Sequence, residues 1–329
     1  MSEQKKNQTF LEVKNLKVEY FSDGQIVHAV NGISLQIERG KTLGLVGETG
    51  AGKTTIAKAI LRILPDIGSK VTAGEVYLDG KELFSLPEQE MRKIRGNGIS
   101  MIFQDPMTAL NPVQTVGDQI AEVVKLHNTG SKTDFEKKAK EMLEMVGIPG
   151  ERYHEYPHQF SGGMKQRVVI AIALACNPSL LIADEPTTAL DVTIQAQVLD
   201  LIDNLKKKFN TSLVLITHDL GVVAEVCDKV AIVYAGKIVE YGNLKHIYNN
   251  PLHPYTKGLF GSIPDFSHKA HRLNPIKGLM PDPSNLPEGC AFAERCPHAT
   301  DACRSKQPEE LEVETGHFVR CLLYEKEGQ

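Results

Sequence analysis

The sequence predicts an α/β fold, and three observations support this prediction. A glycine-rich segment, Gly47–Thr54, follows an apolar run, Leu43–Val46, of the kind that forms a buried strand. From Ile56 to Leu64, apolar residues recur at helical spacing until Pro65 stops the pattern. Two further uninterrupted apolar runs, Leu180–Ala183 and Leu213–Ile216, are typical of strands inside parallel sheets.

The glycine-rich segment is the strongest functional signal in the chain. Its sequence, Gly47-Glu48-Thr49-Gly50-Ala51-Gly52-Lys53-Thr54, fits G-x-x-x-x-G-K-S/T, the phosphate-binding loop of ATP- and GTP-hydrolysing proteins. The glycines let the backbone adopt conformations that a side chain would forbid and approach the phosphates closely. Lys53 supplies a charge for the β- and γ-phosphates, and the Thr54 hydroxyl can hold Mg²⁺. We therefore expect a polyphosphate at the start of the following helix.

Composition indicates an ordinary globular protein of about two domains. Of its 329 residues, 41% are hydrophobic and 24% are charged, and 37 Lys and Arg against 41 Asp and Glu give a formal charge of -4. This charge argues against a nucleic-acid binder. Met1–Gln8 has no apolar signal core, and the longest apolar run, Val168–Cys176, is far shorter than the roughly 20 residues that span a bilayer. We expect a cytosolic chain that reaches a membrane only through a partner.

Alternating apolar residues around the loop predict an antiparallel β element. The pattern covers Leu11–Tyr20 and Ile33–Ile37, and Val76–Leu78 runs into a turn of the hairpin type. Tyr20 is a candidate for stacking on adenine. An ordinary half-buried strand tyrosine is the alternative, and Phe21 is the competing aromatic residue.

Beyond Asp105-Pro106 the apolar pattern becomes helical and predicts a helical insertion over about 107–166. Ser161 is a good N-cap for the helix that follows. Gly162 and Gly163 would leave bare N–H groups at the start of that helix, which predicts a second anion site. Glycine is also common at the start of helices that bind nothing.

Polar side chains follow two of the predicted parallel strands. Asp184 and Glu185 come directly after one, and Thr217-His218 after the other, at the edge where α/β folds bind ligands. Two adjacent carboxylates at the end of a buried strand cost free energy unless a cation or hydrogen-bond donors compensate their charge. Asp184 as a Mg²⁺ ligand and Glu185 as a base for the attacking water would answer that cost. The alternatives are helix capping for the carboxylates and a structural role for His218.

These elements, in this order, resemble an ATP-binding cassette (ABC) ATPase over about 11–242. The resemblance implies a P-loop, RecA-like parallel core with an antiparallel β subdomain and an inserted helical subdomain, at 9–245, followed by a small Cys-containing domain at 246–329. It assigns adenine stacking to Tyr20, the phosphate loop to Gly47–Thr55, and Mg²⁺ to Thr54, Gln104 and Asp184. It makes Glu185 the catalytic glutamate, assisted by Lys53, Gln104 and His218. The family signature is Ser161, Gly162, Gly163 and Gln166, and Asp191, in Ala189-Leu190-Asp191, lies in the loop that crosses the dimer interface.

One departure from the family pattern concerns the signature. It is Phe160-Ser161-Gly162-Gly163-Met164 here, where the commonest form is Leu-Ser-Gly-Gly-Gln. The serine and both glycines that would face phosphate remain. In this family the signature of one subunit completes the ATP site of another, which implies a second homologous ATPase, as a heterodimer or a homodimer.

A closer similarity is to the ATPases of dipeptide and oligopeptide importers. It rests on Phe103–Pro112, on Ala183–Thr193 and on His253-Pro254-Tyr255-Thr256. It implies ATP hydrolysis for peptide import, two transmembrane permease subunits, an extracytoplasmic solute-binding protein acting indirectly, and a peripheral place on the cytoplasmic side of the cell membrane. Nickel or glutathione import is an alternative in this branch. Cassettes that act on ribosomes or nucleic acid are a further alternative, but they carry long coiled coils or two cassettes per chain.

The tail contains a set of four cysteines after a connector at 263–289 rich in Pro, Gly, Ser and Asn. They are Cys290, Cys296, Cys303 and Cys321. Disulfides are not expected in a cytosolic protein. Four thiolates suit an iron–sulfur cluster or structural zinc, with His298 and His317 as substitute zinc ligands. The importer branch implies a 4Fe-4S cluster, and zinc or unliganded buried thiols are the alternatives. Cys176 and Cys227 are expected to be packing residues.

Overall fold

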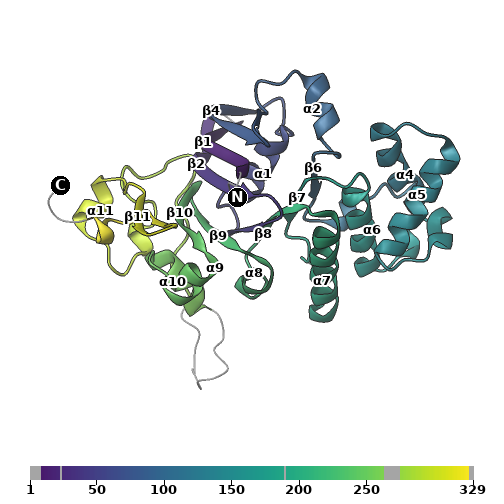
Figure 1. Ribbon diagram of the computed structural model, residues 1–329. Helices are drawn as coiled ribbons and strands as arrows, with labels where there is room; N and C mark the ends of the chain where they lie inside the picture. Colours follow the sequence, from purple (N-terminus) through teal and green to yellow (C-terminus); the bar gives the residue numbers. More distant parts are fainter. Residues whose placement is uncertain (1–8, 23, 189, 263–274, 326–329) are drawn as a thin grey trace, which may run out of the picture. The chain divides into compact units, whose positions relative to one another are not determined.

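The computed structural model describes residues 9–22, 24–188, 190–262 and 275–325 (Figure 1). It contains two compact units. The first includes Ile37–Thr42 and Ser85–Ile216, and the second includes Phe10–Gln36, Leu43–Phe84 and the described residues from Thr217 onward. The predicted boundary at 245/246 falls within a helix of the second unit, Leu244–Asn249. The described part of the tail therefore belongs to the same compact unit as the phosphate loop, and the division at 245 stays a prediction.

The first unit contains a parallel sheet of three buried strands. These are β6 (Ile99–Ile102), β7 (Leu180–Asp184) and β8 (Ser212–Thr217), and β7 pairs in parallel with both of the others. Every residue of β7 and β8 is buried, as their apolar runs predict. Helices α2 (Glu88–Ile94) and α7 (Val192–Phe209) also belong to this unit.

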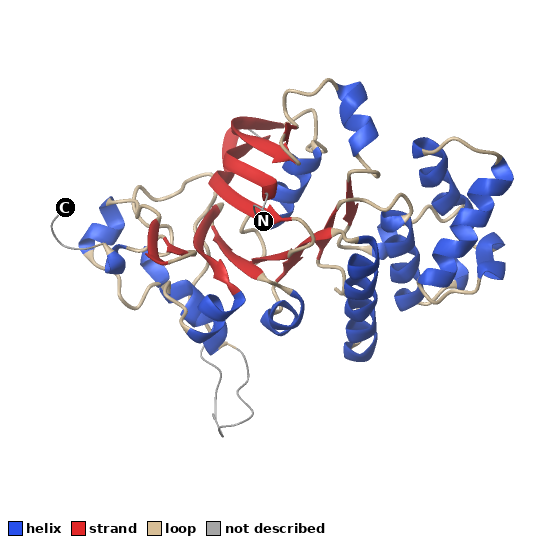
Figure 2. Ribbon diagram, in the orientation of Figure 1, coloured by secondary structure: helices blue, strands red, loops and turns tan. Residues whose placement is uncertain are grey.

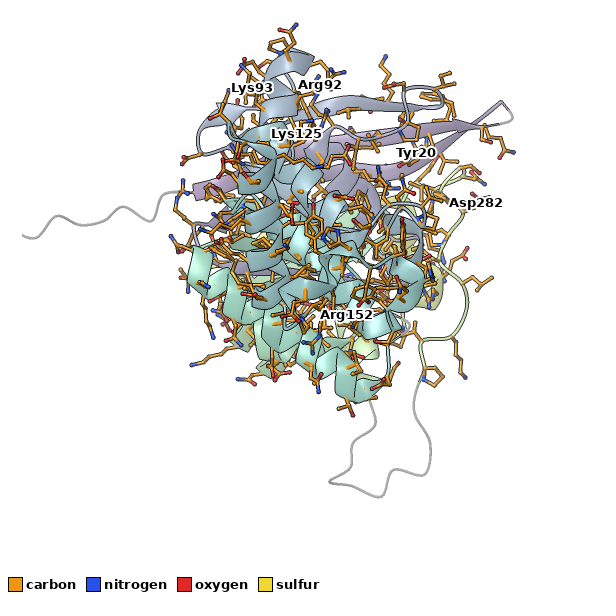
Figure 3. All side chains as sticks on the ribbon, turned by 90° about the vertical axis from the view of Figure 1, so that its right-hand side faces the viewer. Tyr20, Arg92, Lys93, Lys125, Arg152 and Asp282 are labelled. Carbon is orange, nitrogen blue, oxygen red and sulfur yellow. The ribbon has the colours of Figure 1, made fainter. Side chains whose placement is uncertain are left out.

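The stretch of the first unit for which the sequence predicts a helical insertion contains several helices. Figure 2 shows this stretch as helices and loops, and the elements are α3 (Pro106–Ala109), α4 (Val116–His127), α5 (Lys132–Met145), η1 (Gly150–His154), η2 (Pro157–Gln159) and α6 (Gly162–Leu174). Helices α4, α5 and α6 contact one another. Figure 3 labels Lys125 and Arg152, which belong to this part of the chain. Gly147 follows α5 with φ +75°, as expected at a helix end.

The second unit contains the predicted antiparallel β element. It is a sheet in the order β2 (Gln25–Glu38), β1 (Thr9–Ser22), β4 (Ser69–Leu78) and β5 (Lys81–Glu82). Leu11, Val13 and Val18 of β1 are buried. Tyr20 lies near the end of β1, opposite Ser69 of β4 (Figure 3).

A second set of strands in this unit joins the phosphate-loop strand to the tail. Strand β3 (Thr42–Val46) pairs in parallel with β9 (Lys229–Tyr234), which pairs antiparallel with β10 (Lys237–Asn243). The tail then adds β12 (His317–Val319) beside β10, and β11 (Leu311–Glu314) beside β12. The helical elements of this unit are α1 (Lys53–Leu61), α8 (Leu220–Val226), α9 (Leu244–Asn249), α10 (Pro254–Gly261), η3 (Ala293–Arg295), α11 (Asp301–Ser305) and η4 (Leu322–Tyr324).

Helix α1 is shorter than its apolar pattern predicts. It ends at Leu61 because Arg62 adopts a left-handed conformation, φ 52°, in which its N–H donates to the carbonyl oxygen of Ala59. Ile63 and Leu64 therefore lie beyond the helix. Within the described residues, no helix has both the length and the apolar character needed to cross a bilayer.

A buried carboxylate joins β10 to the tail. Glu240 is fully buried and accepts hydrogen bonds from the N–H groups of Leu252 and His253, at 2.8 and 2.9 Å. Its Oε1 also lies 2.9 Å from Nε2 of His317, which is fully buried on β12. These donors offset the cost of removing the carboxylate from water.

Replacing Glu240 by Ala should destabilise this unit strongly. The change leaves two buried N–H groups and the His317 ring without their acceptor. Loss of one member of such a network costs about 3–5 kcal/mol. Thermal unfolding followed by circular dichroism should show a large fall in midpoint. Glu310→Ala is the matched control, because this carboxylate is exposed and pairs with Arg320 at 3.2 Å. An equal fall in the midpoint of both variants would contradict the prediction.

Candidate nucleotide site

The phosphate loop joins β3 to α1, as its sequence predicts. Lys53 opens α1, and only 6% of its surface is exposed. Its Nζ donates to the carbonyl oxygens of Gly47 and Glu48, at 2.8 and 3.0 Å. The ammonium group is therefore held inside the turn of the loop, where the β- and γ-phosphates of a nucleotide would lie.

The three glycines of the loop are required for two different reasons. Gly50 and Gly52 have φ of +85° and +102°, which other residues rarely adopt. A Cβ at Gly52 would also lie 2.4 Å from the carbonyl oxygen of Ala29. Gly47 does not have a positive φ, contrary to the sequence-based expectation. It is needed for space, because a Cβ there would lie 2.2 Å from the carbonyl oxygen of Val233.

Contacts within the second unit fix the loop on both sides. The N–H of Gly236 donates to the carbonyl oxygen of Ala51 at 3.0 Å. The Tyr20 hydroxyl lies 3.4 Å from Oγ1 of Thr55, two residues into α1. Tyr20 is half-buried and Phe21 is 44% exposed. Both aromatic candidates for adenine stacking are thus accessible, and Tyr20 is the one in contact with the loop helix.

The first unit carries the predicted carboxylates and their glutamine. Asp184 ends β7 and is 2% exposed. Glu185 follows it, and its Oε2 accepts from Nε2 of Gln104 and from the hydroxyl of Thr188, each at 3.0 Å. The predicted meeting of Gln104 and Glu185 in one site is therefore present in the structure, although 81 positions separate them in the chain.

The backbone of Glu185 is strained. Its φ is +46°, a left-handed conformation that costs a residue with a Cβ about 1–2 kcal/mol. The N–H of Glu185 donates to the carbonyl oxygen of Ile216 on β8 at 2.8 Å, which holds the conformation. Strain of this kind is concentrated at functional sites. Two donors aim the side chain of Glu185, which suits a group that must orient a water molecule.

The predicted signature lies at the start of α6. Ser161 caps the helix, and its hydroxyl accepts from the N–H of Met164 at 3.4 Å. Ser161 and Gly162 are exposed and Gly163 is half-buried, so this helix start can meet a ligand. Gln166 differs, because it is 1% exposed and both polar atoms of its side-chain amide are buried. Gln166 therefore lies in the interior of its unit, so a contact with a second subunit's ATP would have to come from Ser161, Gly162 and Gly163.

The other two predicted residues lie at the ends of helices. Asp191 caps α7 and accepts from the N–H of Ile194 at 3.0 Å, and it is exposed. Ala189, beside it in the predicted dimer loop, lies outside the described residues. His218 is exposed, just before Asp219, whose side chain caps α8.

Family models match this chain in two places. A model described as ABC transporter matches residues 30–188, and one described as oligopeptide/dipeptide transporter, C-terminal region, matches residues 239–303. The oligopeptide transport ATP-binding protein AppD of Bacillus subtilis is 52% identical over 322 residues, which cover 97% of this chain and 98% of the relative. The chain belongs to the ABC transporter family. It is an ATP-binding subunit of the oligopeptide/dipeptide branch, as the sequence motifs predict.

A second relative and a solved structure support the same family assignment for this ABC ATPase subunit. The dipeptide transport ATP-binding protein DppD of B. subtilis is 50% identical, with 97% of this chain and 96% of the relative covered. A dimeric structure of the ATP-binding cassette MJ0796 bound to ADP and phosphate has a TM-score of 0.64 and 30% identity, over 71% of this chain and 98% of that one. These matches confirm the ABC cassette fold and an ATPase activity.

The four tail cysteines of the ABC ATPase subunit surround one small cavity. His298 and the apolar side chains of Phe292, Leu322 and Leu323 also line it. Burial, together with the smaller effect of the neighbouring cysteines, raises the pKa of the Cys321 thiol to about 11. The N–H of His298 donates to Sγ of Cys296 at 3.4 Å.

Two observations limit which metal ligands this cavity offers. No group of three or more His, Cys, Asp or Glu side chains in the described ranges has its donor atoms arranged for a metal ion. His317 is not among the lining residues and instead pairs with Glu240, so the expectation that it substitutes as a zinc ligand is not favoured. Cys227 is buried and Cys176 is half-buried, as expected for packing residues.

Three residues support the predicted site residues of the ABC ATPase subunit although the sequence assigns them no such role. The hydroxyl of Thr188 donates to the carboxylate of Glu185. Thr188 follows Glu185 by three residues in a turn, and this spacing could have suggested the hydrogen bond. Tyr255 accepts from the N–H of Glu48 at 3.0 Å, and Arg295 pairs with the Glu48 carboxylate at 3.0 Å. Both belong to the tail, more than 200 positions from the loop, and no local pattern links them to it.

Proposed function

We propose that this chain hydrolyses ATP to power the import of di- or oligopeptides through a membrane ABC transporter. The observation that carries this proposal is the nearly full-length similarity to ATP-binding proteins of dipeptide and oligopeptide transport, which includes the tail region. Nickel and glutathione importers are the alternative in the same branch. None of the relatives reported above is named for those solutes.

The proposed chemistry is distributed over named residues. Lys53 and the N–H groups of the phosphate loop bind the triphosphate, while Tyr20 stacks on adenine. Thr54, Gln104 and Asp184 would hold Mg²⁺, which neutralises the phosphate oxygens. Glu185, aimed by Gln104 and Thr188, accepts a proton from the attacking water. His218 donates a hydrogen bond to the γ-phosphate.

The proposed assembly needs a second ATPase subunit. Ser161, Gly162 and Gly163 would face the ATP held by the phosphate loop of the partner, and their exposure supports this. Asp191 would lie at the same interface. The partner is a homologous subunit in a heterodimer, with a homodimer as the alternative. Two transmembrane permease subunits would hold the pair at the cytoplasmic side of the cell membrane, and a solute-binding protein would act through them. We propose no role for nucleic acid.

Affinity purification tests this assembly. The tagged full-length chain, captured from detergent-solubilised membranes of its own organism, should bring with it two integral membrane proteins and a second cassette ATPase. Binding of labelled peptides, rather than nickel or glutathione, by the associated solute-binding protein would decide the solute. Recovery of ribosomes or DNA in place of membrane proteins would reject the transporter proposal.

We also propose that the four tail cysteines hold a 4Fe-4S cluster in a small C-terminal domain. The shared cavity supports this, because all four cysteines line it together with apolar side chains. Buried thiols with raised pKa values become good ligands only when a cation stabilises their thiolates. Structural zinc, bound by the cysteines with His298 as a substitute, is the alternative.

Replacing Cys303 by Ser should remove the cluster. We expect protein purified without oxygen to be brown, with iron, sulfide and an absorbance near ~400 nm, and the variant to lose most of this iron. Cys176→Ser is the matched control, because Cys176 lies in the other unit and should not change the iron content. A colourless wild-type protein containing zinc would contradict the cluster and favour the alternative.

A further inference from the structure

The phosphate loop contains a residue that its function does not explain. Glu48 is the second residue of Gly47–Thr54 and the only carboxylate in that segment. ATP carries several negative charges on its phosphates, and a like charge in the binding loop would repel them. The carboxylate of Glu48 is 32% exposed, so solvent screens it only in part.

An arginine of the tail compensates this charge. Nη1 of Arg295 lies 3.0 Å from Oε2 of Glu48, and Nη2 lies 3.1 Å from Oε1. The two parallel contacts make a bidentate pair, the strongest arrangement between a guanidinium and a carboxylate. The side chain of Arg295 is 6% exposed, so water screens the pair weakly.

Neighbouring groups hold Arg295 in place. Its Nε donates to the carbonyl oxygen of Lys277 at 3.0 Å, and its Nη1 also donates to the hydroxyl of Tyr234 at 3.2 Å. The hydroxyl of Tyr255, a fully buried residue of α10, accepts from the backbone N–H of Glu48 at 3.0 Å. The tail therefore fixes both the backbone and the side chain of Glu48, and all these residues belong to one compact unit.

We infer that Arg295 is a positioning residue of the ATP site, which neutralises the Glu48 carboxylate and so lets the phosphate loop accept a triphosphate. This inference rests on the proposal that Gly47–Thr54 binds ATP. Arg295 belongs to the tail, between Cys290 and Cys296 in the sequence. Through this residue, the tail affects how tightly the phosphate loop binds ATP.

Four variants of the full-length chain test this role, with the dissociation constant of ATP measured by calorimetry. Arg295→Gln leaves the carboxylate uncompensated and should weaken ATP binding about tenfold. Arg295→Lys keeps the charge and should remain within about threefold of wild type. Glu48→Gln removes the repelling charge but leaves the Arg295 guanidinium without its carboxylate; it completes the double-mutant cycle and should bind ATP more tightly than Arg295→Gln. The double variant Glu48→Gln with Arg295→Gln should restore an affinity within about threefold of wild type.

Rescue by the double variant separates charge compensation from a merely structural role. If Arg295 only held the tail in place, the double variant would bind ATP as weakly as Arg295→Gln, and that result would overturn the inference. Thermal melting of each variant checks that it is folded. Arg304→Gln is the matched control, because Arg304 also lies beside a tail cysteine but is 60% exposed and pairs with the exposed Asp301.

The proposed function and this inference can fail separately. A wild-type chain that does not bind ATP, or a Lys53→Ala variant that binds it normally, would contradict the proposed phosphate loop. ATP binding that Lys53→Ala abolishes and Arg295→Gln leaves unchanged would contradict only the role of Arg295.

Discussion

Replacing Glu185 by Gln should nearly abolish ATP turnover while leaving ATP binding intact. The amide keeps the shape of the carboxylate, and its oxygen can still accept from Gln104 and Thr188, but it cannot take a proton from water. Loss of a positioned base lowers the rate about 10²–10⁴-fold, or about 3–5 kcal/mol of barrier. Steady-state phosphate release measures the rate, and calorimetry measures the affinity. The variant should also accumulate as an ATP-bound dimer.

Glu122→Gln is the control for this experiment. Glu122 is an exposed carboxylate on α4, in the same unit as Glu185. The Glu122→Gln variant should hydrolyse ATP at the wild-type rate. Unchanged steady-state hydrolysis in Glu185→Gln would remove Glu185 from its proposed role.

Lys53→Ala should act on binding itself. The ammonium group of Lys53 is buried in the loop against the carbonyl oxygens of Gly47 and Glu48, so its charge meets the phosphates in weakly screened surroundings. Hydrogen bonds to charged groups contribute about 1.5–3 kcal/mol, so we expect the dissociation constant of ATP to rise roughly 10- to 100-fold.

Lys58→Ala provides the comparison for Lys53→Ala. Lys58 lies in the last turn of the same helix, away from the loop end. The Lys58→Ala variant should bind ATP with the wild-type dissociation constant, measured by calorimetry. Equal affinities for Lys53→Ala and the wild type would show that the loop does not hold the triphosphate.

The sequence was sufficient for the parts of the fold whose signals are local. The phosphate loop, the buried strands at 180–184 and 212–217, and the Ser161 cap each follow from adjacent residues. Strand β1 follows from the alternation of its buried residues. Hydrophobic period and capping chemistry act over one or two turns, which is the range that a sequence pattern reports.

The features that the sequence did not predict depend on contacts between distant segments. The Arg295–Glu48 pair joins positions 247 residues apart, and β12 beside β10 carries the tail into the sheet of the phosphate-loop strand. The sequence-based explanation of Gly47, a backbone conformation that only glycine adopts, was also wrong. Gly47 is needed because the carbonyl oxygen of Val233 leaves no space for a Cβ, and Val233 lies on a strand far along the chain. The family resemblance assigns Gln166 to the signature, and the structure places its side chain in the interior, which the resemblance does not indicate.

The most direct measurement is peptide transport by the complex that contains this chain. The complex, purified through a tag on this subunit and placed in lipid vesicles with its solute-binding protein, should take up a labelled di- or oligopeptide when ATP is supplied on the side of the ATPase subunits. The same complex with Glu185→Gln should take up none. Equal peptide uptake by both complexes, or uptake without ATP, would contradict the claim that ATP hydrolysis at this chain drives peptide import.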